Sequence, residues 1–487
     1  VAPDMRSLAV AALILCLPAG NAVSSTALRA AARPALVPSA SPRVSGAMTA
    51  ATATARPKFM PSPQAVAELT ESATKDMLDR VEAMPLDLPS YGVVEASFVR
   101  TGVAPSEGTP PVVLLHGFDS SCLEFRRTLP KLEALGVEAY ALDLLGWGFG
   151  DTGGGDVSVE AKRAALLEFR RQVLGDRQMT LLGVSLGAAV VIDFNAVHSD
   201  AVASAILVDP QGFIDGAPPV PEPFARGGIR VLGSWPLRSL ANQLAYADTD
   251  AFATNDAIRV GLLHCARPSW EDDSVSWLLG GGYSVSSLVP RLAPKPTAIL
   301  WGRQDEILPP AEFAPKFVAA LPGAAFRWVE ECGHSPHLEQ PDALAAAVRA
   351  FLDSGPDAVA GDDDVSEIVR LANRGALEKL ADGAGRGGAR RRPVREPRRK
   401  VRESCRRRQG ARRIPRHANP RPQRAGRAPR AAQGFRAERA GDGAGCGLGA
   451  RPDLLLRARA RPGGRAWLRG AAIMNERRSR VPPTSPR

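Results

Sequence analysis

Residues 179–187 read Met-Thr-Leu-Leu-Gly-Val-Ser-Leu-Gly, and this stretch decides the fold. It is a short apolar run that ends in a Gly-x-Ser-x-Gly sequence centred on Ser185. The segment that follows, from Leu186 to about His198, is rich in Ala and Val and has the length of a helix. Alone, this motif is weak evidence, because a chain of this composition is expected to contain on the order of a few tenths of a chance match. Its context predicts a strand, a sharp turn at Ser185 and a helix.

The two glycines of this sequence have a steric explanation. A Cβ atom at Gly183 or Gly187 would clash inside so tight a turn. The turn exposes the Ser185 side chain at the end of the strand. The N-terminus of the next helix, which is the positive end of its dipole, points at the negative charge that develops nearby. Ser185 is therefore the candidate nucleophile.

Other short apolar runs recur along the chain without polar alternation. They are typical of parallel strands buried on both faces. Amphipathic segments, such as 160–174 and 311–321, separate them. This alternation predicts an α/β fold with a mostly parallel, doubly wound sheet. The predicted strands besides 179–184 are Val112–Leu115, Val137–Leu142, Ala203–Val208, Thr297–Trp301 and Phe326–Val329.

Two further candidates for catalysis follow late strands. Asp305 ends Trp-Gly-Arg-Gln-Asp after the 297–301 run, and His334 follows the last run. Side chains at the carboxyl ends of parallel strands meet at one edge of the sheet. Serine is a weak nucleophile and needs a base to take its proton, and an acid orients that base. We therefore expect a triad of Ser185, His334 and Asp305.

Other residues could fill these roles. Asp209 also follows a strand and is an alternative acid, and His337 is an alternative base. His116 follows the first core strand, and we interpret it as structural. The Gly-rich segment 143–151 lacks the Gly-Lys-Ser/Thr of a phosphate-binding loop, so we interpret it as a loop that shapes the site.

Taken together, these motifs resemble the α/β-hydrolase family. The resemblance covers about residues 110–352 and rests on five segments in the same order as in the family. Two longer segments, 114–127 and 270–283, look like a plant and algal plastid branch whose substrate is not settled. The five segments are LLHGF (114–118), DLLGWGFGD (143–151), GVSLG (183–187), WGRQD (301–305) and GHSPHLEQP (333–341).

The resemblance implies an eight-stranded core, a helical lid and the Ser-Asp-His triad. The lid corresponds to about residues 213–292, which interrupt the strand–helix alternation. In this fold the N–H groups of Phe118 and Leu186 form the oxyanion hole. Because some hydrolases of the family carry Asp at the nucleophile position, Ser185 argues against epoxide hydrolases and dehalogenases.

We therefore expect a serine hydrolase that cleaves a small-molecule carboxylic ester. Trp235, Trp270, Trp277 and Leu278 in the lid favour a substrate with an apolar part, such as a lipid or pigment ester, although ordinary packing explains them equally well. Acyl transfer or C–C hydrolysis on the same triad, or ligand binding without catalysis, are the alternatives. Six scattered cysteines without metal-binding spacing point to no metal, and we expect no cofactor.

The N-terminus has the composition of a targeting segment. Met5 and Arg6 precede the apolar run 8–17, and no acidic residue occurs between Asp4 and Glu68. This pattern resembles the two-part leader of plastid proteins in algae with complex plastids. We expect a removed leader at 1–60, a hydrolase domain at 61–355 and plastid import, with secretion or a membrane anchor as alternatives.

The C-terminal residues 356–487 differ in composition from the rest. From Arg386 onward they hold about 31 of the 62 basic but about 6 of the 51 acidic residues, so the net charge is near +25 there and near −14 before it. With few aliphatic residues, such a tail is predicted to be disordered. Anionic membrane contact is an alternative, as is out-of-frame translation of GC-rich DNA. We do not expect nucleic-acid binding, because only Phe435 and Trp467 could stack on bases.

Overall fold

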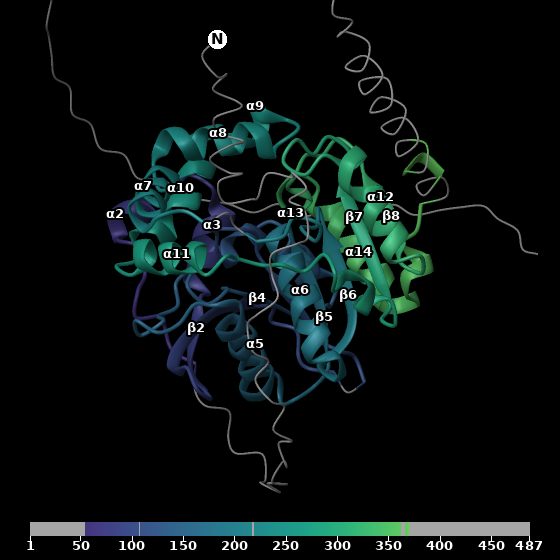
Figure 1. The fold of residues 1–487 in the computed structure, drawn as a ribbon, viewed down its shortest axis with the longest axis horizontal. Helices are drawn as coiled ribbons and strands as arrows, with labels where there is room; N and C mark the ends of the chain where they lie inside the picture. Colours follow the sequence, from purple (N-terminus) through teal and green to yellow (C-terminus); the bar gives the residue numbers. More distant parts are fainter. Residues whose placement is uncertain (1–53, 107, 217–218, 362–365, 369, 371–487) are drawn as a thin grey trace, which may run out of the picture. The chain divides into compact units, whose positions relative to one another are not determined.

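The computed structural model describes residues 54–106, 108–216, 219–361, 366–368 and 370. Its centre is one eight-stranded sheet with the strand order β1-β2-β4-β3-β5-β6-β7-β8 (Figure 1). The strands are β1 (Glu82–Leu88), β2 (Gly92–Arg100), β3 (Val112–Leu115), β4 (Ala139–Leu142), β5 (Met179–Val184), β6 (Val202–Val208), β7 (Thr297–Gly302) and β8 (Ala325–Val329).

Strands β3 to β8 pair with one another in parallel, and β1 and β2 add an antiparallel edge, in which β2 pairs with β4. The α/β fold with a mostly parallel sheet is thus confirmed. Each predicted strand is present within two residues of its expected start. Strand β4 begins at Ala139 and not at Val137, because the Val137 N–H donates to the Leu132 carbonyl and so belongs to the preceding turn.

The strands are connected by helices that cover both faces of the sheet. Alternate residues of β3 enter two separate cores: Val113 and Leu115 one, Val112 and Leu114 the other. Helices α5, α6 and α12 contribute to the first core, and α3, α4 and α14 to the second. Their bounds are α2 (Pro63–Ala67), α3 (Ser72–Asp79), α4 (Leu129–Ala134), α5 (Val159–Leu174), α6 (Leu186–Val197), α12 (Pro310–Ala320), α13 (Pro336–Glu339) and α14 (Pro341–Ser354).

A helical insertion lies between β6 and β7, where the lid is predicted. Figure 1 shows its helices grouped together beside the sheet. They bury apolar side chains such as Ile229, Trp270 and Leu278 in the first core. The lid helices are α7 (Glu222–Leu232), α8 (Trp235–Ala245), α9 (Thr249–Phe252), α10 (Asn255–Leu263) and α11 (Trp270–Leu279), and the short 3₁₀ segment η3 (His264–Ala266) joins the last two.

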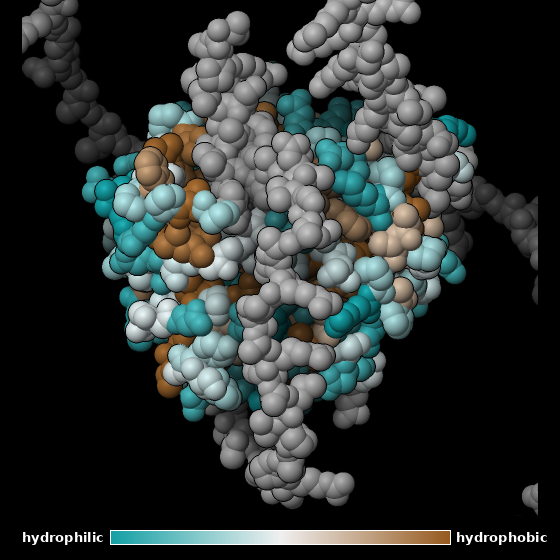
Figure 2. All heavy atoms as spheres, in the orientation of Figure 1, coloured by the Kyte–Doolittle hydropathy of each residue, from teal (hydrophilic) through white to brown (hydrophobic). Residues whose placement is uncertain are grey.

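The outer surface of the lid is partly apolar. Phe224, on α7, is 75% exposed, and Val231, later on α7, and Trp235, at the start of α8, are exposed as well. Figure 2 shows hydrophobic surface gathered over the lid helices. Among the described residues no helix combines the length and hydropathy that crossing a bilayer requires. Peripheral membrane contact stays a prediction.

The segment 54–60 packs on the domain, although the sequence places it in the leader. Ala55 bridges to Ala83 of β1, and the ring of Phe59 stacks on Phe149 with centroids 6.4 Å apart. These contacts favour a domain that begins before residue 61. The remainder of the predicted leader, up to residue 53, and the predicted tail from 371 onward lie outside the described residues.

Candidate active site

Ser185 occupies a strained turn between β5 and α6. Its backbone has φ 51° and ψ −117°, a region that residues other than glycine rarely adopt. A Cβ atom on Gly183 would clash with the Gly187 carbonyl, and one on Gly187 would clash with the Leu115 carbonyl. The close approach of three backbones therefore explains both glycines. Strain at this position is typical of functional sites, where the surrounding structure maintains it.

The predicted oxyanion donors come from the ends of β3 and β5. Phe118 lies just after β3, and Leu186 is the first residue of α6. Within the described part of the chain, neither N–H donates to another residue. Both are thus available to an oxygen atom of a substrate.

His116 fixes the orientation of one of these donors. Its Nδ1 lies 2.8 Å from the carbonyl oxygen of Gly117, which belongs to the same planar peptide group as the Phe118 N–H. Its Nε2 accepts from the Leu144 N–H at 3.0 Å. Burial lowers the pKa of His116 to about 3, so the imidazole is neutral. The interpretation of His116 as structural fits these contacts.

Asp305 and His334 meet at the ends of β7 and β8. Nδ1 of His334 lies 2.8 Å from Oδ2 of Asp305. The second carboxylate oxygen accepts from the N–H groups of Ile307 and Leu308, at 2.8 and 2.9 Å. The indole of Trp301 donates to Oδ2 at 3.2 Å. Three donors besides the imidazole thus hold the carboxylate in place against it.

Asp209, the alternative acid, lies close to this pair. Its Oδ1 accepts from the Gly302 N–H at 2.7 Å, and its buried Oδ2 has no partner among the described residues. Burial, together with the nearby charge of Asp305, raises the pKa of Asp209 well above its usual value. The structure places Asp305, not Asp209, against the imidazole.

His337, the alternative base, has a different environment. Its ring packs against Phe125, with centroids 5.6 Å apart, and its Nε2 is 3.8 Å from the Glu124 carboxylate. Burial lowers its pKa to about 3. Because Nδ1 of His337 has no partner among the described residues, no acid orients this imidazole as Asp305 orients His334.

Ser185 and His334 line the same cavity, which has a volume of about 190 Å³. Phe118 lies at its wall as well. Among the described residues no hydrogen bond joins the Ser185 hydroxyl to the imidazole, so this link of the triad stays a prediction. Such bonds often tighten only when substrate binds. The apolar walls come from both the sheet and the lid, and include Leu123, Val184, Leu232, Ile258, Val260 and Ile307.

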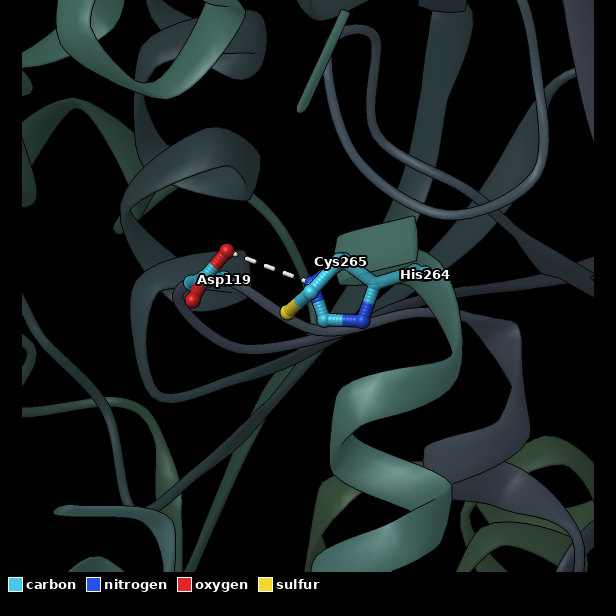
Figure 3. Close-up of side chains that lie close together, drawn as sticks. All are labelled: Asp119, His264 and Cys265. Atoms are coloured by element: carbon cyan, nitrogen blue, oxygen red, sulfur yellow. Dashed lines mark hydrogen bonds and ion pairs between the residues drawn. The ribbon is translucent and has the colours of Figure 1, made fainter. Parts of the chain in front are cut away.

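A second polar cluster lies where the lid meets the loop after β3. It contains Asp119, His264 and Cys265, which Figure 3 shows close together, and Arg238, which forms an ion pair with Asp119. The spacing of these four residues follows no catalytic motif. Asp119 lies in the segment 114–127 that resembles the plastid branch, but that resemblance assigns it no role. The amphipathic pattern of the lid helices marks the faces that are buried and does not show which polar side chains meet.

Two groups of side chains bring potential metal ligands within 4.8 Å of one another: Asp209, Asp305 and His334, and Asp119, His264 and Cys265. In the second group the Arg238 guanidinium contacts the Asp119 carboxylate and lies 3.3 Å from the Cys265 sulfur. A positive charge therefore already neutralises these ligands. In the first group the His334–Asp305 hydrogen bond uses the ligand atoms themselves. Neither arrangement favours a metal ion.

Comparisons with known proteins agree with the fold and the motifs. A model of the alpha/beta hydrolase family matches residues 112–347. The alpha/beta hydrolase domain-containing protein VTE7 of Arabidopsis thaliana is 33% identical over 302 residues, which are 61% of this chain and 90% of that protein. A 2-hydroxy-6-oxo-6-(2'-aminophenyl)hexa-2,4-dienoic acid hydrolase of Metapseudomonas resinovorans is 26% identical and covers 55% of this chain and 90% of its own.

Solved structures resemble the chain as well. One is a thermophilic esterase from Thermogutta terrifontis, with 22% sequence identity and a TM-score of 0.45, covering 56% of this chain and 98% of its own.

Proposed function

The chain belongs to the alpha/beta hydrolase family, and from this premise we propose that it is a serine hydrolase acting on a carboxylic ester through Ser185, His334 and Asp305. The observation that carries the proposal is the 2.8 Å contact of Nδ1 of His334 with Oδ2 of Asp305, at a cavity that Ser185 also lines. An imidazole oriented in this way presents its other nitrogen for proton transfer.

The proposed reaction has two halves. Ser185 Oγ attacks the ester carbonyl carbon while its proton passes to Nε2 of His334, and the N–H groups of Phe118 and Leu186 bind the oxyanion. The imidazolium then protonates the leaving alkoxide, which departs as an alcohol. Water attacks the acyl-enzyme, gives a proton to His334, and the acid leaves as Ser185 recovers its proton. Asp305 stabilises the imidazolium in both halves.

The cavity supports an ester with an apolar part. Its walls carry aliphatic side chains from the lid and from the sheet, and burial of such a substrate is favourable at roughly 25 cal/mol per Å². A lipid acyl ester or a pigment ester has this character. Together with the predicted leader, this supports a role in the plastid, which is part of the proposal.

A second candidate reaction is C–C hydrolysis. The observation in its favour is that relatives with 24–27% identity are named as hydrolases of 2-hydroxy-6-oxo dienoic or dienedioic acids. If an alcohol or another acceptor took the acyl group in place of water, the same site would be an acyltransferase. The proposed ester reaction requires fewer additional groups, because the triad and the oxyanion donors suffice for it.

The test is hydrolysis of a series of p-nitrophenyl esters from acetate to octanoate by the full chain. We expect turnover that rises with acyl length, and Ser185→Ala should lower kcat by about 10⁴-fold or more without a change in melting temperature. A dienoic acid substrate serves as the matched alternative. Cleavage of that substrate with no ester hydrolysis would replace the ester proposal with C–C hydrolysis.

If Ser185→Ala keeps most of the ester hydrolysis, Ser185 is not the nucleophile. A wild-type protein that binds the esters but turns over neither substrate class would favour ligand binding without catalysis.

A further inference from the structure

Asp119 is a buried charge directly after the proposed oxyanion donor Phe118. Its side chain is 0% exposed, and its φ of 48° lies in the left-handed region, which favours glycine. A buried carboxylate in a strained turn persists only when other groups stabilise it. The groups that do so are the key to its role.

The partners of Asp119 come from the lid. Nε1 of Trp270, on α11, donates to Oδ1 at 2.7 Å. Nε2 of His264 lies 3.2 Å from the same oxygen, and Figure 3 shows this contact as a dashed line. Arg238, on α8, forms an ion pair with Oδ2 and donates a second bond to the backbone carbonyl of Asp119 at 3.1 Å. Three separate lid segments thus converge on one residue of the loop after β3.

These contacts keep the carboxylate charged. Burial by itself would raise the pKa of Asp119, but the charges of Arg238 and His264 hold it well below its usual range. The charged hydrogen bonds are stronger than neutral ones, so the turn is held firmly. Cys265, Asp119 and His264 do not form a catalytic triad. In a triad the two ring nitrogens of the histidine face different partners, whereas Nε2 of His264 faces both Asp119 and Cys265.

The geometry on both sides of Phe118 is therefore fixed from different directions. The peptide group before it is held from the core by His116, through the Gly117 carbonyl. The residue after it is held from the lid, through Asp119. An oxyanion donor is effective only when it stays about 2.7–3.1 Å from the oxygen that becomes charged, so a small displacement of this turn is costly.

We infer that Asp119 is a positioning residue for the oxyanion hole: its carboxylate ties the turn that carries the Phe118 N–H to Arg238, His264 and Trp270, so that the lid holds the hole in its working geometry. This inference rests on the proposed function and deepens it. It assigns the lid a part in transition-state stabilisation besides covering the substrate.

The experiment compares Asp119→Asn and Trp270→Phe with Asp273→Asn in the full chain. Asp273 is a matched control, because it is a buried carboxylate on the same helix α11 that pairs with Arg267 and does not line the cavity. The substrate is p-nitrophenyl butyrate, and a trifluoromethyl ketone serves as an inhibitor that forms an oxyanion on Ser185. Melting temperatures identify variants that fold.

We expect Asp119→Asn to lower kcat by about 10- to 100-fold and Trp270→Phe by about 3- to 10-fold. Both losses should be no larger than the loss of about 100-fold or more that removal of an oxyanion donor itself causes. KM should stay within about twofold, and ketone affinity should fall by the same factor as kcat, because both report the charged oxygen. Asp273→Asn should stay within about twofold of wild type in kcat and ketone affinity.

The inference is overturned if folded Asp119→Asn or Trp270→Phe keeps the kcat and ketone affinity of the control, or if only KM changes. Should Asp119→Asn fail to fold, Trp270→Phe decides alone. Failure of the proposed function is a different result: the wild type itself then neither hydrolyses the ester nor binds the ketone at Ser185, and the inference falls with it.

Discussion

Nδ1 of His334 lies 2.8 Å from Oδ2 of Asp305, although 28 residues separate them in the chain. The two side chains meet because β7 and β8 are parallel neighbours, so the segments that follow them emerge at the same edge of the sheet. Backbone N–H groups of Ile307 and Leu308 anchor the carboxylate from behind. This contact orients the imidazole toward the cavity that Ser185 lines.

The two buried acids near His334 predict losses of different size from the same substitution. Asp305→Asn should lower kcat by about 10³- to 10⁴-fold, because an amide donor opposite Nδ1 favours the wrong imidazole tautomer. Asp209→Asn should lower it less than about tenfold, because the imidazole bonds to Asp305 and an amide oxygen can still accept from the Gly302 N–H. Steady-state kinetics on the p-nitrophenyl esters compare the two, and a larger loss in Asp209→Asn would make Asp209 the acid.

The packing around Gly187, two residues after Ser185, predicts that a substitution there lowers the stability of the domain. Gly187→Ala should destabilise the domain by about 2 kcal/mol or more, because the added Cβ clashes with the backbone carbonyl of Leu115, which cannot move without disturbing β3. Gly227→Ala is the matched control: this glycine is exposed in helix α7 with open space at its Cβ position.

The control should gain about 0.5–1 kcal/mol, since alanine has the higher helix propensity. Urea unfolding measures both variants. Equal stability of Gly187→Ala and wild type would contradict the packing of the turn described above.

The ion pair of His264 with Asp119 predicts a pH dependence of stability. Burial would lower the pKa of His264, but the neighbouring Cys265 and the hydrogen bond with Asp119 raise it to about 9, above the unfolded value near 6.5. The pair therefore stabilises the fold fully below pH ~6.5, and this contribution, on the order of 3 kcal/mol, is lost as the pH rises through ~9. Arg238 faces the same carboxylate and stays charged throughout this range.

Urea unfolding of wild type and His264→Gln between pH 6 and pH 10 measures this effect. The wild type should lose stability over that interval, and the variant should show a flatter profile because glutamine does not titrate. Parallel profiles of the two proteins would rule out a charged His264.

The sequence predicts the parallel core well because its strands are buried on both faces. Runs such as Val112–Leu115 contain only apolar residues, are short, and are rich in β-branched or aliphatic side chains, which is typical of a strand buried on both faces. The edge hairpin is harder to predict. Strand β1 contains Pro85 and alternates buried with exposed residues, which is tolerated at a sheet edge, where one side of the strand needs no partner.

The candidate site divides in the same way. Ser185, Asp305 and His334 could be identified because each follows a strand, and topology brings strand ends together. The cluster around Asp119 could not, since Arg238, His264 and Trp270 reach it from lid helices whose packing no periodicity specifies. The roles of the triad and of the oxyanion donors remain predictions that the measurements above address.

The central claim is that the hydroxyl of Ser185 is the activated nucleophile. The most direct test treats the folded full chain with a fluorophosphonate and maps the adduct by peptide mass spectrometry. A single adduct on Ser185 that is abolished in His334→Ala is the predicted result. Ser120, Ser121 and Ser335 also line the cavity, so an adduct on one of them, or no adduct on folded protein, would contradict the account.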